Sequence, residues 1–166
     1  MGKILVTGGL GFIGSHTVVE LQNSGYEVVI IDDLSNSRIE VLNGIEGITG
    51  KEPEFVEMDL KDKKAVLDFF KDRQIDGVIH FAASKAVGES VEKPLLYYEN
   101  NIASLVYLLE ALLANEVKSF IFSSSCTVYG QADELPITEN APVKKAESPY
   151  GNTKQIGEEI LEDVSK

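Results

Sequence analysis

The stretch Lys3-Ile-Leu-Val-Thr-Gly-Gly-Leu-Gly-Phe-Ile-Gly-Ser-His16 decides the fold of this chain. Its apolar run ends at Thr7, and the glycines that follow fit two registers, Gly8-x-x-Gly11-x-x-Gly14 and Gly9-x-Gly11-x-x-Gly14. Either register places glycines where a strand turns tightly into a helix, whose first N–H groups and positive dipole end attract phosphate. The pattern therefore predicts a strand–turn–helix unit that binds the pyrophosphate of a dinucleotide.

Asp32 is the acidic partner that such a unit requires. It closes the second apolar run, Glu27–Asp32, and lies roughly 20 residues beyond the last glycine, as in dinucleotide-binding folds. A carboxylate at this position accepts hydrogen bonds from ribose hydroxyls and repels a 2′-phosphate. The sequence therefore predicts NAD, rather than NADP, as the cofactor.

Five short apolar runs recur along the chain, separated by longer segments with helical periodicity. Continuous β-branched runs of this length are typical of strands buried on both faces, as in a parallel sheet. Alternating strands and helices predict an α/β fold, a doubly wound parallel sheet of the Rossmann type with right-handed crossovers. The predicted strands are Lys3–Thr7, Glu27–Asp32, Glu54–Met58, Gly77–Ala82 and Lys118–Ser123.

The segments between and after these runs give further expectations. The glycines of Gly44–Gly50 and the prolines of Gln131–Lys145 predict two surface loops, and a long helix is expected from Pro94 to Asn115. A last helix should begin with Ser148 as its cap and Pro149 in its first turn. No sixth strand follows it, so we expect residues 1–166 to be one incomplete NAD-binding domain, a fragment truncated before the C-terminal strands and the substrate-binding portion.

Tyr150 and Lys154 are the candidate catalytic pair, because their i, i+4 spacing places them on one face of that last helix. A cation beside a phenol favours the phenolate and lowers the pKa of the phenol. Such a pair can exchange a proton with a substrate hydroxyl while a hydride moves to or from nicotinamide. Ser125 ends the serine run after the fifth strand, where ligands bind in open α/β sheets, and can hydrogen-bond the same substrate oxygen.

Composition narrows the possible partners. The chain has 15 basic and 27 acidic residues and a net charge of −12, which disfavours nucleic acids and anionic membranes. It lacks an apolar run of about 20 residues or a signal peptide, so a cytoplasmic protein is expected. The single cysteine, Cys126, is predicted to be a small core residue. No ligand spacing suggests a metal site, and both histidines are predicted to be structural.

Taken together, these residues resemble the extended short-chain dehydrogenase/reductase family, most closely its UDP-glucose 4-epimerase branch, over essentially all 166 residues. Besides the glycine loop, the resemblance is carried by Asp32-Asp-Leu-Ser-Asn-Ser37, Met58-Asp-Leu60, His80-Phe-Ala-Ala-Ser-Lys-Ala-Val-Gly-Glu-Ser90, Pro94-Leu-Leu-Tyr-Tyr-Glu-Asn-Asn101, Phe122-Ser-Ser-Ser-Cys-Thr-Val-Tyr-Gly130 and Ser148-Pro-Tyr-Gly-Asn-Thr-Lys154. Related sugar dehydratases show Thr-Asp-Glu where this chain has Ser125-Cys126-Thr127, so water elimination is disfavoured.

The resemblance implies a role for each matching residue. Tyr150 would be the acid/base for the sugar 4-hydroxyl, Ser125 would assist it, and Lys154 would hold the nicotinamide ribose. The remaining implied NAD contacts are Gly8, Gly11, Phe12, Ile13 and Gly14 at the pyrophosphate, Asp32, Asp33, Leu34, Ser35, Asn36 and Ser37 around the adenosine ribose, Asp59 and Leu60 at the adenine, and Phe81, Ala82, Ala83, Ser84, Lys85 and Asn100.

The implied reaction interconverts UDP-glucose and UDP-galactose, as in galactose metabolism, through a 4-keto intermediate, with hydride transfer to and from bound NAD. Family members are roughly twice as long, and pair as homodimers through the helices that match Pro94–Asn115 and Pro149–Lys166. The isolated chain is therefore expected to be inactive. Two alternatives stay open: another nucleotide-sugar enzyme of the family, such as a uronate 4-epimerase or a 4,6-dehydratase, and a non-catalytic NAD-binding module.

Overall fold

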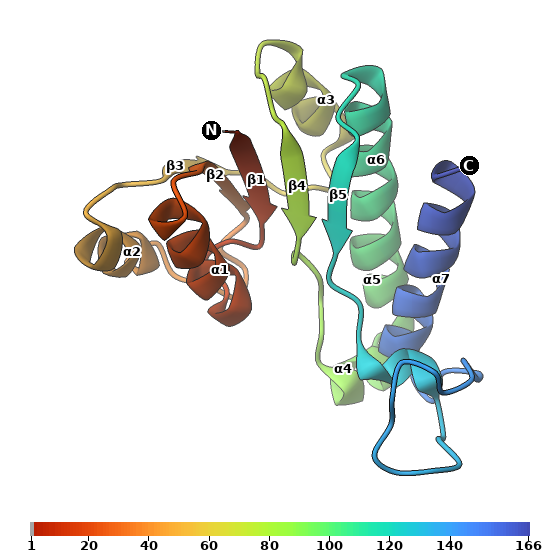
Figure 1. The fold of residues 1–166 in the computed structure, drawn as a ribbon. Helices are drawn as coiled ribbons and strands as arrows, with labels where there is room; N and C mark the ends of the chain where they lie inside the picture. The colour runs from red at the N-terminus through yellow and green to blue at the C-terminus, as the bar shows by residue number, and fades with distance from the viewer. Residues whose placement is uncertain (1) are drawn as a thin grey trace. The chain divides into compact units, whose positions relative to one another are not determined.

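The computed structural model describes residues 2–166 and contains one five-stranded sheet in the order β3-β2-β1-β4-β5. All four strand pairs are parallel, and non-consecutive neighbours require crossover connections (Figure 1). The doubly wound parallel sheet predicted from the sequence is confirmed. The strands are β1 (Lys3–Thr7), β2 (Glu27–Asp32), β3 (Glu54–Glu57), β4 (Gly77–His80) and β5 (Ser119–Phe122).

The helices occupy the segments between and after the strands. They are α1 (Phe12–Asn23), α2 (Val41–Thr49), α3 (Lys63–Lys71), α4 (Val87–Glu92), α5 (Pro94–Tyr98), the π-helical turn η1 (Glu99–Ala103), α6 (Ser104–Ala114), the short 3₁₀ turn η2 (Cys126–Tyr129) and α7 (Pro149–Val164). The long helix expected from Pro94 is present, but η1 interrupts its α-helical hydrogen bonding. π turns of this kind occur frequently at functional sites.

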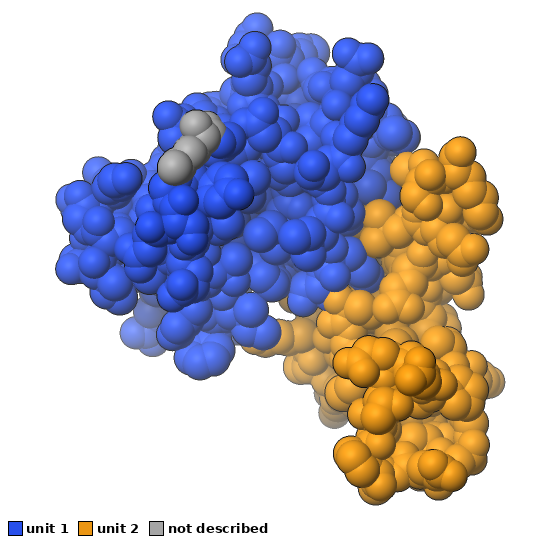
Figure 2. All heavy atoms as spheres, in the orientation of Figure 1, with its two compact units in different colours: residues 1–82, 106–123 blue, residues 83–105, 124–166 orange. Residues whose placement is uncertain are grey.

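The chain divides into two compact units, coloured separately in Figure 2. Unit 1 comprises Met1–Ala82 and Val106–Ser123, and unit 2 comprises Ala83–Leu105 and Ser124–Lys166. The sheet and α1 to α3 belong to unit 1, whereas α4, α5, η1, η2 and α7 belong to unit 2. A single domain over residues 1–166 stays a prediction.

The core of unit 1 forms where the central strands are buried on both faces. Leu5 lies opposite Val29 on one neighbouring strand and Val78 on the other, and all three are at most 2% exposed. One buried cluster beneath α1 and α2 comprises Val6, Leu10, Val18, Val28, Ile30 and Ile45. This burial fixes the glycine loop, because the loop joins β1 to α1.

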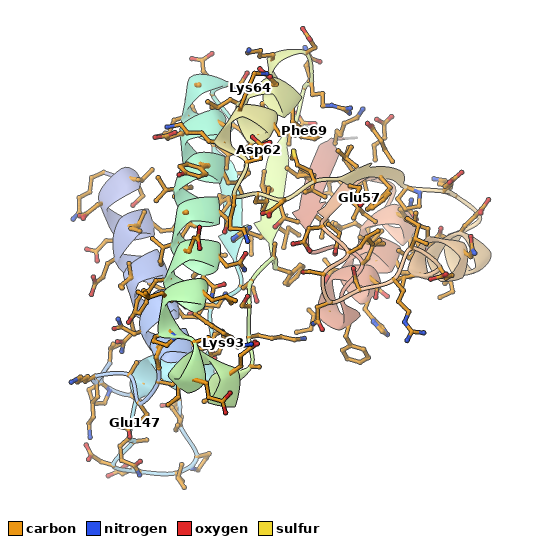
Figure 3. All side chains as sticks on the ribbon, turned by 180° about the vertical axis from the view of Figure 1, so that it is seen from behind. Glu57, Asp62, Lys64, Phe69, Lys93 and Glu147 are labelled. Carbon is orange, nitrogen blue, oxygen red and sulfur yellow. The ribbon has the colours of Figure 1, made fainter. Side chains whose placement is uncertain are left out.

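Helix α3 shows how local sequence sets an element's boundary. Asp62, which lies at its start in Figure 3, accepts a hydrogen bond from the Ala65 N–H at 3.0 Å. Lys64 is exposed on the first turn, and Phe69 and Phe70 bury the opposite face. Capping by Asp62 and burial of the phenylalanine face together explain why the helix begins at Lys63.

Two expectations from the sequence are wrong. Gly44–Gly50 was expected to be a loop, but most of it belongs to α2, whose Ile45 is buried. Apolar residues spaced for a helix outweigh the glycine penalty here, and Gly50 ends the helix with a φ of +69°. Cys126 is exposed rather than a core residue, because it opens η2 at the surface.

Within residues 2–166, no helix has the length and apolar character needed to traverse a bilayer.

Candidate active site

The glycine loop of unit 1 is shaped by close backbone approach. Gly8 has a φ of +67°, and a Cβ there would lie 2.8 Å from the Ala82 nitrogen after β4. A Cβ on Gly14 would lie 2.2 Å from the Gly8 carbonyl oxygen. These contacts exclude side chains at both ends of the Gly8-x-x-Gly11-x-x-Gly14 register.

Helix α1 begins directly after this loop. Gly11 is its N-cap, and the first bond of the helix runs from the Ser15 N–H to the Gly11 oxygen at 2.9 Å. The N–H groups of Phe12, Ile13 and Gly14 therefore precede the helical bonding pattern. The side chains of Phe12 and Ile13 are exposed, so this helix start can accept an anion.

Asp32, at the end of β2, ties the glycine loop to the turn that follows it. Its Oδ2 accepts a hydrogen bond from the Leu10 N–H at 3.0 Å. Its Oδ1 accepts bonds from the Leu34 N–H at 3.1 Å and the Ser37 hydroxyl at 2.6 Å. The carboxylate is 8% exposed. These bonds hold it beside the glycine loop, as the sequence predicts for a ribose-binding group.

The other predicted NAD contacts in unit 1 lie at the same edge of the sheet. Asp59 and Leu60 follow β3, and Phe81 and Ala82 follow β4. The Phe81 N–H donates to the Thr7 oxygen at 3.0 Å, and the Asp59 carboxylate accepts the Lys61 N–H at 2.8 Å. Parallel strands bring their carboxyl ends to one edge, which is where such folds bind ligands. The turn Asp33, Leu34, Ser35, Asn36 and Ser37 completes this set.

Unit 2 holds the remaining predicted NAD contacts, Ala83, Ser84, Lys85 and Asn100. Asn101, which the sequence analysis did not select, anchors this loop. Its side-chain amide accepts the Ser84 N–H at 2.8 Å and donates to the Ser84 oxygen at 2.9 Å. Asn100 donates from its amide to the Ser84 hydroxyl at 3.0 Å. The π turn thus directs two successive asparagines toward one loop.

Unit 2 also holds the predicted catalytic set. Ser125 is the N-cap of η2, and its hydroxyl accepts the Thr127 N–H at 3.2 Å and the Thr127 hydroxyl at 2.9 Å. Helix α7 packs against this turn: a Cβ on Gly151 would lie 3.2 Å from Thr127 side-chain atoms. The glycine after Tyr150 therefore lets the helix approach the turn that carries Ser125. Ser148 caps α7 as predicted, accepting the Gly151 N–H at 3.1 Å.

Lys154 lies on the buried side of α7 and is 4% exposed. Burial lowers the pKa of Lys154 from 10.5 to about 8, although the Glu158 carboxylate opposes this shift. The neighbouring Thr153 hydroxyl accepts a hydrogen bond from the Asn101 amide at 3.0 Å and donates to the backbone carbonyl oxygen of Tyr150 at 2.7 Å. One buried network therefore fixes the helical turn that runs from Tyr150 to Lys154.

An open cavity of about 390 Å³ lies beside Ser125, entirely within unit 2. The turn around Ser125 forms one side, and the exposed loop before α7 forms another. The cavity is lined by Ser124, Ser125, Cys126, Val128, Tyr129, Ile137, Thr138, Glu139 and Glu158. Among these described lining residues two are carboxylates and none is basic, and Ser124 donates its hydroxyl proton to Glu158.

Comparison with known proteins identifies the family. The family model described as "NAD dependent epimerase/dehydratase family" matches residues 4–166. The chain belongs to this family. Its Rossmann-type sheet and its glycine loop fit that membership, since the close approach of Gly8 and Gly14 leaves bare backbone at the start of α1, where an anion can bind. Among residues 2–166, no group of three potential metal ligands comes together.

Individual relatives share this sequence closely. The chain is 55% identical over 161 residues to a UDP-glucose 4-epimerase of Bacillus subtilis, covering 97% of the chain and 47% of the relative. A Dictyostelium discoideum UDP-glucose 4-epimerase is 51% identical over 162 residues, with 98% and 47% covered. The chain spans about half the length of the curated relatives it matches.

Solved epimerase structures share the fold. The Bifidobacterium longum UDP-glucose 4-epimerase, solved with NAD⁺ and UDP, has a TM-score of 0.95 and 48% identity, covering 98% of this chain and 48% of that one. The Stenotrophomonas maltophila UDP-glucose 4-epimerase, solved with NAD and formylated UDP-arabinopyranose, has a TM-score of 0.94 and 45% identity, with 99% and 48% covered.

Proposed function

We propose that this chain is the NAD-binding and proton-transfer portion of a UDP-glucose 4-epimerase, which interconverts UDP-glucose and UDP-galactose. One arrangement carries the proposal: Ser125, Tyr150 and Lys154 stand on two elements that pack together through Thr127 and Gly151. Identity of 55% to a relative of that name supports it.

Each residue of this set has its own role in the proposed reaction. Tyr150 takes the proton from the sugar 4-hydroxyl and later returns it, acting as general base and then general acid. Ser125 hydrogen-bonds the same oxygen and orients it. Lys154 binds the ribose next to nicotinamide and supplies positive charge beside the phenol. When NAD is bound, it supplies a nicotinamide ring that can accept a hydride from sugar C4 and give it back.

The first-turn N–H groups of α1 bind the pyrophosphate, and Asp32 with the turn to Ser37 binds the adenosine ribose. Asp59 and Leu60 line the adenine site. The remaining contacts in unit 1 are Phe81 and Ala82. Those proposed for unit 2 are Ala83, Ser84, Lys85 and Asn100.

The cavity beside Ser125 is lined by neither Tyr150 nor Lys154, and its acidic lining favours an uncharged group next to Ser125. Glu139 and Glu158 line it, and no described basic residue does, so the carboxylate of a uronic acid would be repelled. This observation disfavours the uronate 4-epimerase alternative. A 4,6-dehydratase is disfavoured because Cys126 and Thr127 occupy the positions of its Asp-Glu pair.

Exposed apolar side chains support a homodimer through the helices of Pro94–Asn115 and Pro149–Lys166. Leu95 is 81% exposed, Leu96 43% and Val164 41%. Burial of such residues against a second copy would remove apolar area from water. A cytoplasmic location completes the proposal, and the isolated chain is expected to bind NAD without turnover.

The deciding experiment joins this chain to the C-terminal half of the Bacillus subtilis relative and assays the chimera with UDP-galactose and NAD. We expect UDP-glucose to form, and we expect Tyr150→Phe to reduce turnover by about 10²–10⁴-fold while NAD stays bound. Tyr26→Phe, at an exposed tyrosine, should leave turnover unchanged. A folded chimera that dehydrates the sugar, prefers a uronate, or tolerates Tyr150→Phe would contradict the proposal.

A further inference from the structure

Gln155 follows Lys154 on α7 but serves a different part of unit 2. Its side-chain amide donates to the Val128 carbonyl oxygen of η2 at 2.7 Å and also to the Lys144 carbonyl oxygen. Its Oε1 accepts the Ala146 N–H at 3.3 Å. One half-buried side chain therefore joins α7 to η2, 27 residues earlier in the sequence, and to the segment that contains Lys144 and Ala146 just before the helix.

These bonds close the base of the loop formed by residues 131–144. A Cβ on Gly130, whose φ is +57°, would lie 2.4 Å from the Lys145 carbonyl oxygen, so the two ends of the loop meet. Compact loops with adjoining ends are frequently functional. The loop runs over the surface before Glu147, which Figure 3 labels near the start of α7.

The loop closed by Gln155 forms a wall of the cavity beside Ser125. Ile137, Thr138 and Glu139 line the cavity from this loop, opposite Ser125 and Val128 of the turn. Gln155 holds both walls, because it bonds Val128 on one side and Lys144 at the loop base on the other.

The hydrogen bonds from Gln155 to Val128, Lys144 and Ala146, here called the Gln155 clamp, also fix the Ser125 hydroxyl. Val128 donates its N–H to the Ser125 carbonyl oxygen at 3.2 Å, and Gly130 donates to the Thr127 oxygen at 3.2 Å. The Thr127 N–H in turn donates to the Ser125 hydroxyl at 3.2 Å. A displacement of Val128 would therefore propagate through this turn to Ser125.

We propose that Gln155 is a positioning residue that orients Ser125, and that the 131–144 loop it closes is the specificity-determining wall of the cavity beside Ser125, with the sugar as occupant. The inference rests on the proposed function for the identity of the occupant, a nucleotide-linked sugar. The clamp itself is a property of this chain, and its test does not require turnover.

The test measures amide hydrogen exchange in residues 1–166, comparing the parent with Gln155→Met, which keeps the side-chain length and removes the hydrogen bonds. We expect the Thr127, Val128 and Gly130 amides to exchange about 2–10-fold faster, the range for losing one hydrogen bond. The Asn152 and Ser165 amides, bonded within or at the end of α7, should not change. Gln131→Met, at an exposed position of the loop, is the matched control.

Two further variants separate the clamp from general packing. Gln155→Lys keeps donors for the Val128 and Lys144 oxygens and should retain most of the protection. Gln155→Glu places a carboxylate against two carbonyl oxygens and should increase exchange and tryptic cleavage after Lys144 beyond the Met variant. Two results would overturn the proposed role of the Gln155 hydrogen bonds. One is equal amide exchange in all variants, and the other is a uniform increase that includes the Asn152 and Ser165 amides.

The catalytic part of the inference is measured in the chimera. Gln155→Met should lower kcat about 2–10-fold and raise the KM for UDP-galactose. NAD affinity should stay unchanged, because the side-chain hydrogen bonds of Gln155 go to Val128, Lys144 and Ala146 and to no proposed NAD ligand. Unchanged kcat and KM beside faster exchange would overturn the positioning role. An inactive parent chimera would contradict the proposed function, while the exchange result would still decide the clamp.

Discussion

A Cβ atom on Gly14 would lie 2.2 Å from the carbonyl oxygen of Gly8. Gly14 is in the first turn of α1, and Gly8 directly follows the last residue of β1. The helix can therefore start here only because neither residue carries a side chain. The same close approach leaves the helix N-terminus open to a pyrophosphate.

Gly14→Ala should therefore damage folding and NAD binding together. Relieving the clash requires a backbone shift, which costs about 1–3 kcal/mol of unfolding free energy. Urea unfolding and NAD titration measure the two effects. Gly44→Ala is the matched control, because nothing lies within 4 Å of a Cβ there, and it should stabilise α2 by about 0.5–1 kcal/mol. A fully stable, NAD-binding Gly14→Ala chain would refute the steric explanation.

Lys154 makes stability depend on pH. Its pKa of about 8 in the folded chain lies below the ordinary lysine value of 10.5, so between these pH values the unfolded chain holds a proton that the folded chain has released. Compared with a variant that lacks the Lys154 amine, the parent therefore gains unfolding free energy from pH 8 to pH 10.5. This relative stability is lowest below pH 8.

We predict that Lys154→Met is more stable than the parent at pH 7, by on the order of 1–3 kcal/mol, because a buried charge is replaced by an apolar side chain. The difference should shrink above pH 10. Unfolding free energies of both proteins at pH 7, 9 and 10.5 measure it. A variant less stable than the parent at pH 7 would show that Lys154 contributes to stability rather than opposing it.

The exposed side chain of Leu95 tests the proposed homodimer. Light scattering should give twice the chain mass for the parent and a monomer for Leu95→Asp, since a carboxylate would be buried in the interface. Leu135→Asp is a suitable control because Leu135 is 83% exposed but lies in the loop before α7. A parent that is monomeric at all concentrations, or a dimeric Leu95→Asp variant, would exclude this interface.

The sequence predicted the sheet and the strand–turn–helix geometry of the glycine loop well because their signals are local. Continuous β-branched runs indicated all five strands, although β3, β4 and β5 end one or two residues before the predicted limits. The glycine register and Asp32 lie within one strand–helix–strand unit, so their spacing alone predicted their proximity. The Ser148 cap and Tyr150–Lys154 spacing are likewise contained in one helix.

Non-local contacts could not be predicted in this way. Asn101 reaches Thr153 and Ser84 through long-range hydrogen bonds, and Gln155 reaches Val128 and Lys144. Nothing in their flanking residues distinguishes them from ordinary surface amides. A signal was nevertheless present at Gly151, because a glycine inside a capped helix indicates close packing against another segment.

The most direct measurement is a calorimetric titration of residues 1–166 with NAD and with NADP under identical conditions. Asp32 lies within hydrogen-bond distance of the glycine loop, and its carboxylate would repel a 2′-phosphate. We predict that NAD binds at least about tenfold more tightly, or about 1.4 kcal/mol, and that Asp32→Asn reduces this preference. Equal or tighter binding of NADP by the folded chain would contradict the assignment of Asp32 to the ribose and of this fold to NAD.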